Sequence, residues 1–258
     1  MRVNCFMKNR HRYTLAVLVA AIVGCTSQEH ARQDGKDAGT AKAARALTVN
    51  TLFSDNMVIQ QGKPIEVWGT APDEAEVRVT LGDAEAVAMA EGGTWTARLP
   101  AMPHGGSHTM TIRCGAEALT FDNILVGDVW LASGQSNMQW TVSNSKDAEQ
   151  EIANADHPCI RIFTVNSTCA YSPLTTVEGT WQVVTPETIG DFSAVGYYFG
   201  RYIHTKTGRN IGLIASARGG STAEAWVPED AIRAQKEPFY EGYLEHRDAM
   251  RPVFEEPG

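Results

Sequence analysis

The amino-acid sequence predicts an α/β fold: an incomplete three-layer α/β/α domain with a parallel sheet, preceded by a small antiparallel β-sandwich. Two observations support this prediction. Between residues 47 and 121, apolar and polar side chains alternate in short runs, which is typical of strands with one buried face. From Ile124 onward, strand-like apolar runs alternate with helix-like segments, and the order βαβαβ indicates a parallel sheet covered by helices.

The first 46 residues are typical of an export signal followed by a tether. Four basic residues precede an apolar run at residues 13–23, which is too short to span a bilayer. Gly24 stands directly before Cys25, an arrangement that resembles a bacterial lipoprotein signal. We therefore expect a signal peptide at residues 1–24, lipidation of Cys25 and a flexible tether at residues 25–46. The protein would then be exported, as a periplasmic or cell-surface lipoprotein whose lipid is its only contact with the membrane.

The charge of the mature chain argues against nucleic acid as a partner. Removing residues 1–24 takes away four basic residues and no acidic ones, which leaves 18 basic and 30 acidic residues and a formal charge of −12. Phosphate binding requires a basic surface. Apart from Cys25, the mature chain has three cysteines, an odd number that gives no disulfide framework, although Cys159 and Cys169 could pair in an oxidising compartment.

Residues 47–123 are predicted to form the β-sandwich. Glycine-containing turns interrupt the alternating runs about every ten residues, which suits an antiparallel arrangement. His104 and His108 flank a glycine pair in a predicted loop, and we expect no metal there. Nothing in this region gathers catalytic groups, so its predicted role is structural or sugar-contacting.

Residues 124–258 are predicted to form the α/β domain. Its strands are expected at residues 124–132, 160–165 and 211–215, and its helices at residues 147–155 and 193–207. The second helix should end at Gly208.

A polar turn follows the first of these strands. The sequence from Asp128 to Met138 runs from an apolar strand into a serine, Ser136, flanked by two amide side chains. Such a turn at the carboxyl end of a strand would expose the hydroxyl as a nucleophile. These residues are also common in ordinary turns, so the turn alone leaves both interpretations open.

A second glycine-rich turn follows the third strand. Gly219 and Gly220 lie in it, and two such turns on one sheet edge should converge. Main-chain N–H groups of a glycine turn can point at an oxyanion beside a serine nucleophile. The alternative is a plain connection between a strand and a helix.

Five separated stretches contain motifs of a known family, at residues 52–60, 127–138, 160–163, 192–200 and 219–226. They resemble the sialate O-acetylesterases, carbohydrate esterases of the SGNH, or GDSL-like, hydrolase superfamily, over roughly residues 47–230. The resemblance implies an SGNH-like esterase that removes acetyl groups from glycans through an acetyl-enzyme on Ser136. It also implies an oxyanion hole formed by the Ser136 N–H, by Gly219 or Gly220, and by an amide side chain. It implies an O-acetylated carbohydrate as substrate, sialic acid or another glycan, and neither a cofactor nor a metal.

The sequence departs from the family pattern after Trp226. The family's Gln-Gly-Glu-x-Asn block, which supplies the amide, and its Asp-x-His-Pro block, which supplies the base, are both missing. His157, His204 and His246 lack the expected context, and none is a strong candidate for the base. We therefore expect a C-terminally truncated esterase domain that is inactive or weak, because loss of a general base costs about 10²–10⁴-fold in rate.

Two other functions compete with the esterase. A non-catalytic glycan-binding surface lipoprotein could use Trp130, Trp140 and Trp226 to contact sugars. An α/β-hydrolase lipase is excluded, because Met138 stands where that motif requires a glycine two residues after the serine.

Overall fold

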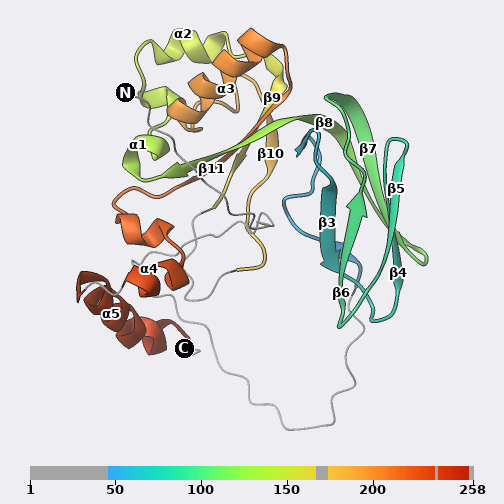
Figure 1. The fold of residues 1–258 in the computed structure, drawn as a ribbon. Coiled ribbons are helices and arrows are strands. Elements are labelled where there is room, and N and C mark those ends of the chain that lie inside the picture. The colour runs from blue at the N-terminus through green and yellow to red at the C-terminus, as the bar shows by residue number, and fades with distance from the viewer. Residues whose placement is uncertain (1–45, 167–173, 236–237, 256–258) are drawn as a thin grey trace, which may run out of the picture.

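The computed structural model describes residues 46–166, 174–235 and 238–255. Figure 1 shows a β-rich half, with β3 to β7, beside an α/β half that contains α1, α2, α3 and β9 to β11. The predicted signal peptide, Cys25 and all but the last residue of the predicted tether lie outside the described residues. No helix within the described ranges is both long and apolar enough to cross a membrane.

Two sheets form the β-rich half. The three-stranded sheet has the order β1-β3-β6, with β1 (Thr48–Val49), β3 (Ile65–Thr70) and β6 (Thr94–Leu99). The other sheet contains β2 (Val58–Gln60), β4 (Glu76–Leu81), β5 (Ala84–Met89), β7 (Gly105–Cys114) and part of β8 (Glu117–Gly134). Strand β6 has the predicted alternation, because Trp95, Ala97 and Leu99 are buried and the residues between them are exposed.

Strand β8 belongs to both halves of the molecule. It pairs with β7 and β2 along residues 117–127 and with β11 along residues 128–134, so it passes from one half into the other (Figure 1). The domain boundary predicted between residues 123 and 124 therefore falls inside one continuous strand. The sequence pattern changes there because the neighbours of β8 change, although the strand itself continues.

The α/β half confirms the predicted fold class, but its sheet is mixed. Its strand order is β10-β9-β11-β8, where β8, β9 (His157–Thr164) and β11 (Ile211–Ala217) are parallel. Strand β10 (Trp181–Val184) is antiparallel to β9 and was not predicted. The prediction of a purely parallel sheet is therefore wrong at this edge. The three-layer arrangement and the truncation stay predictions.

The helical segments are α1 (Ser136–Gln139), η1 (Val142–Asn144), α2 (Ala148–Ala153), α3 (Ala194–Thr207), η2 (Ala223–Trp226), α4 (Glu229–Gln235) and α5 (Pro238–Glu255). Helix α3 begins and ends where the sequence predicts. Ser193 Oγ accepts a hydrogen bond from Gly196 N at 3.1 Å, which caps the first turn. Gly208 ends the helix with φ of +67°, in the left-handed region that glycine adopts without strain.

Helix α3 packs closely on the sheet at Gly200. A methyl group added to Gly200 would lie 2.7 Å from Leu213 Cδ1 in β11, so a larger residue there would force the leucine side chain to shift. Ile162, Leu213 and Tyr197 are at most 2 % exposed and form part of the core between helix and sheet. The contact fixes β11, and with it the turn that follows, relative to α3.

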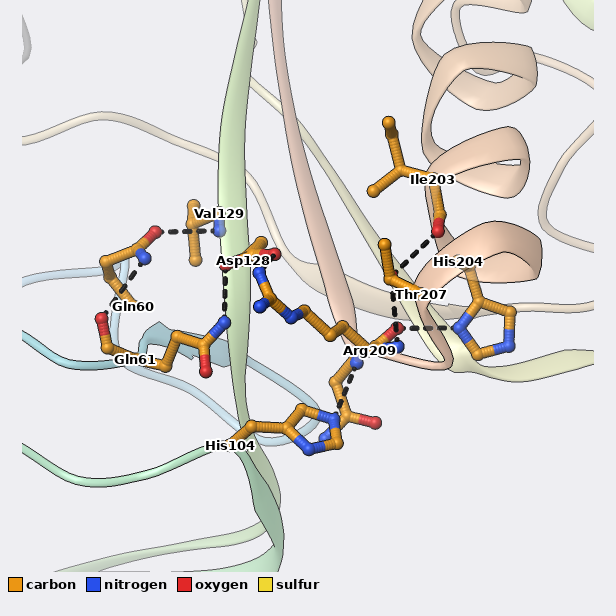
Figure 2. Close-up of polar contacts among 10 residues, drawn as sticks. Gln60, Gln61, His104, Asp128, Val129, Ile203, His204, Thr207 and Arg209 are labelled. Carbon is orange, nitrogen blue, oxygen red and sulfur yellow. Dashed lines mark hydrogen bonds and ion pairs between the residues drawn. The ribbon is translucent and has the colours of Figure 1, made fainter.

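A polar cluster joins the two halves at the amino ends of the parallel strands (Figure 2). Asp128 in β8 accepts a hydrogen bond from Gln61 at 2.7 Å and pairs with Arg209 at 3.1 Å. Gln60 Oε1 accepts from Val129 N at 2.9 Å. Burial raises the pKa of Asp128, but the hydrogen bonds from Gln61 and Arg209 outweigh it and hold that pKa below its usual range.

Candidate active site

Ser136 is the first residue of α1, directly after the carboxyl end of β8. Strands β8 and β11 are in parallel register up to the pair Gly134 and Ala217, so they end at the same level. The turns that follow them therefore start at one edge of the sheet, where α/β proteins place their functional groups. Arg218 N donates to Gly134 O at 2.9 Å and extends this pairing into the two turns.

The structure brings Ser136 and Gly219 together. A methyl group added to Gly219 would lie 3.6 Å from Ser136 Cβ, which is van der Waals contact. Gly220 differs, because a methyl group there would have no neighbour within 4 Å. Its φ of +79° indicates that Gly220 serves the turn, since a residue with a side chain is strained in that region. Of the two predicted glycines, Gly219 is the one beside the serine.

Two glutamine side chains accept hydrogen bonds from Ser136 and Gly219. Gln135 Oε1 lies 3.1 Å from Ser136 Oγ and 3.3 Å from Ser136 N, and it accepts from both. Gln139 Oε1 accepts from Gly219 N at 2.7 Å. From the sequence, Gln135 was noted only as one of the two amides that flank Ser136, and Gln139 was not noted. The available signal was their place in the serine motif, one residue before and three residues after Ser136.

The turn after β11 is fixed by a short chain of hydrogen bonds. Ser221 Oγ donates to Arg218 O at 2.8 Å and accepts from Trp226 Nε1 at 2.8 Å. Ser221 is buried. Trp226 is half-buried, and its indole N–H helps to hold the turn that carries Gly219.

Two of the three histidine candidates lie at the wrong edge of the sheet. His157 is the first residue of β9, and His204 Nδ1 donates at 2.6 Å to the main-chain oxygen of Arg209, just before β11. Both positions are at the amino ends of the strands, whereas Ser136 follows a carboxyl end. Burial and the positive charge of Arg201 also lower the pKa of His157.

The third candidate, His246, is an exposed residue of α5. Within the described ranges, no histidine forms a hydrogen bond with Ser136. The same ranges contain no group of three or more His, Cys, Asp or Glu side chains placed to hold a metal ion. Cys169, and with it the predicted pairing with Cys159, lies outside the described residues.

Two of the tryptophans considered for sugar binding are exposed. Trp140 is 56 % exposed and follows α1, where its main-chain N–H donates to Ser136 O at 2.9 Å. Trp130 is 44 % exposed on β8 and makes an edge-to-face contact with Phe199 of α3. Only Trp140 is close to the serine along the chain.

Comparison with known proteins defines the class of protein. Residues 126–251 match a family model described as carbohydrate esterase, sialic acid-specific acetylesterase. The structure is similar to that of a carbohydrate acetylesterase from Xanthomonas citri, with a TM-score of 0.70 and 34 % identity over 73 % of this chain and 44 % of the other. Fold and sequence together therefore place the chain among the relatives of carbohydrate esterases.

The particular family follows from curated relatives. The chain is 32 % identical over 219 residues to sialate O-acetylesterase from Rattus norvegicus, which covers 75 % of this chain and 40 % of the rat protein. It is 33 % identical over 204 residues to the Homo sapiens enzyme, covering 70 % of this chain and 39 % of the human protein. The chain belongs to the sialate O-acetylesterase family, and it spans about two fifths of the length of these relatives.

Proposed function

We propose that this chain carries the nucleophile and the main-chain oxyanion donors of a carbohydrate O-acetylesterase that removes acetyl groups from sialic acid or another glycan. The observation that supports the proposal is the approach of Gly219 to Ser136 at a shared sheet edge. In the proposed site, the N–H of Gly219 and the N–H of Ser136 both serve the carbonyl oxygen of the ester that the Ser136 hydroxyl attacks, which is the arrangement that acyl transfer requires.

The proposed reaction has two steps. Ser136 Oγ attacks the acetyl carbonyl carbon, and the negative charge that forms on the carbonyl oxygen is stabilised by the N–H groups of Ser136 and Gly219. The bond from the carbonyl carbon to the sugar oxygen then breaks, and the sugar oxygen takes up the proton that the serine hydroxyl has lost. Water attacks the acetyl-enzyme in the second step, releases acetate and restores the serine hydroxyl.

We propose that this chain turns over slowly or not at all by itself. An oxyanion donor contributes about 10²–10³-fold to the rate. A general base contributes about 10²–10⁴-fold. Among the described residues, no histidine forms a hydrogen bond with Ser136, so the proposal gives this chain the oxyanion contribution without the contribution of a histidine base.

Acetate release from O-acetylated sialic acid tests this function, with acetylated xylan as a second substrate. We expect negligible release by the wild-type chain in plain buffer and measurable release when imidazole is added as an external base. Ser136→Ala should abolish the stimulated reaction. Equal release by Ser136→Ala in imidazole would show that the serine is not the nucleophile, and substantial turnover in plain buffer would refute the proposed weakness.

A second candidate function is non-catalytic glycan binding, which the exposure of Trp140 beside the site favours. Aromatic faces are suitable partners for the apolar faces of sugars, and Trp140 is 56 % exposed. Titration calorimetry with sialic acid and with xylo-oligosaccharides tests this function. Binding that persists in Ser136→Ala and is lost in Trp140→Ala would favour it, whereas absence of heat with every sugar would reject it.

The predicted lipid anchor remains a separate proposal. It depends on Cys25, which lies outside the described residues. Expression of the full chain in a bacterium, with fractionation into membrane and soluble pools, tests it. We expect the wild type in the membrane pool and Cys25→Ala in the soluble exported pool; the same distribution for both would contradict lipidation.

A further inference from the structure

Two side-chain amides accept from the main-chain N–H groups of the candidate site. The inference drawn from these contacts rests on the proposed function. We propose that Gln135 and Gln139 form a latch: their Oε1 atoms occupy the N–H groups of Ser136 and Gly219, and an ester carbonyl must displace them before it can react. The two glutamines therefore control access to the nucleophile without themselves taking part in bond making.

The contact between Gln139 and Gly219 is the stronger half of the proposed latch. Its Oε1 lies 2.7 Å from Gly219 N, a short hydrogen bond that joins residues 80 positions apart in the chain. A methyl group added to Gly219 would lie 2.8 Å from the same oxygen, so this atom covers the face of Gly219 that also faces Ser136. An amide oxygen accepting from this N–H stands where a substrate carbonyl oxygen would have to accept.

Gln135 closes the other half of the site. Its Oε1 accepts from Ser136 N and from Ser136 Oγ, so the main-chain donor and the hydroxyl proton of the nucleophile share one acceptor. While this contact persists, the hydroxyl proton points at Gln135, where it is not available to a base. Substrate binding has to release the donor and the hydroxyl together.

The latch can open because it is exposed. Gln135, Ser136 and Gln139 are all exposed, so water can solvate the released amides and little packing is lost when they turn away. An exposed hydrogen bond of this kind contributes only a modest net free energy. The latch therefore slows the reaction of Ser136 without preventing it.

A purely structural role for Gln139 makes the opposite prediction. If the amide only fastens the turn after β11 to α1, removing it loosens the turn, and the oxyanion donor should be positioned less well. Loss of a latch raises the reactivity of Ser136, whereas loss of a structural fastening lowers it. The direction of the change decides between the two roles.

The test measures labelling of Ser136 by a fluorophosphonate, which needs no acetylated sugar. Ser136 Oγ attacks phosphorus, an O–P bond forms, the P–F bond breaks, fluoride leaves and the hydroxyl proton passes to the buffer. Intact-mass spectrometry gives the rate for wild type, Gln139→Met and Gln135→Met. Gln150→Met replaces an exposed glutamine of α2 and serves as the matched control.

We expect Gln139→Met and Gln135→Met each to label about three- to tenfold faster than wild type, as loss of one net hydrogen bond would give. Gln150→Met should label at the wild-type rate. The amide hydrogen of Gly219 should also exchange faster in Gln139→Met, as followed by NMR. Equal or slower labelling of both site variants, or unchanged exchange at Gly219, overturns the latch. Absence of labelling in every protein, including wild type, even with imidazole added as an external base, instead overturns Ser136 as the nucleophile.

Discussion

Arg209 Nη1 lies 3.1 Å from Asp128 Oδ2, and this ion pair joins β8 to the turn before β11. At the carboxyl end of each strand, away from this ion pair, lies one of the two turns of the candidate site. Gln61, from the turn after β2, donates to the other oxygen of the same carboxylate at 2.7 Å. Asp128 therefore ties together the two strands that position Ser136 and Gly219, and it fastens both to the β-rich half (Figure 2).

The first prediction concerns the pH dependence of stability. Because the pKa of Asp128 is lower in the folded chain, its stabilising effect is full above the unfolded value of about 3.9 and is lost as pH falls through the folded value. Asp128→Asn should lower the free energy of unfolding by about 1 kcal/mol at pH 7, since Arg209 is half exposed. Urea unfolding at pH 7 and below pH 4 should show this difference shrinking. The exposed Asp83→Asn serves as control, and a difference independent of pH would contradict the prediction.

The second prediction concerns the packing of α3. Gly200→Ala places a methyl group 2.7 Å from Leu213 Cδ1 in the core, and overpacking of this kind costs about 1–3 kcal/mol. Gly242→Ala is the matched control in α5, because its methyl group has no neighbour within 4 Å. The control should be neutral or gain up to about 1 kcal/mol from helix propensity. Thermal unfolding of the two variants measures the contrast, and equal stability would show that the contact at Gly200 can relax.

The third prediction concerns Tyr197. Its hydroxyl donates to Glu151 at 2.9 Å, and Arg201 pairs with the same carboxylate. Burial and the negative charge of Glu151 raise the pKa of Tyr197. We expect Tyr197 to stay protonated until the fold is lost in alkali. The absorbance titration of Tyr197→Phe should therefore overlay that of wild type up to about pH 11, where ordinary tyrosines have ionised; a missing tyrosine step below that pH would refute this.

Local patterns in the sequence were sufficient to predict the α/β class and the main elements. Helix α3 was predictable because Ser193 and Gly208 mark its ends through their own chemistry. Strand β10 was missed because four residues show no clear period and its pairing with β9 is not local. The contact between Gln139 and Gly219 was missed for a related reason: it exists only because two strands end in register, which the sequence does not state.

The last prediction separates the two glycines of the turn after β11. Gly219→Ala puts a methyl group 2.8 Å from Gln139 Oε1, which has to shift, and 3.6 Å from Ser136 Cβ, so the methyl group itself takes the place of a reagent beside the nucleophile. Its backbone conformation remains accessible to alanine. Gly220→Ala meets no atom within 4 Å but must hold φ at +79°, which costs about 1–2 kcal/mol. We therefore expect Gly219→Ala to label much more slowly with fluorophosphonate at nearly unchanged stability. Gly220→Ala should lose stability and keep most of its labelling rate under conditions where it is folded. Gly219→Ala acts by filling space beside Ser136, whereas Gly220→Ala acts by straining the backbone. If Gly220→Ala instead labelled slowly and Gly219→Ala labelled at the wild-type rate, the proposed oxyanion donor would be Gly220 and not Gly219.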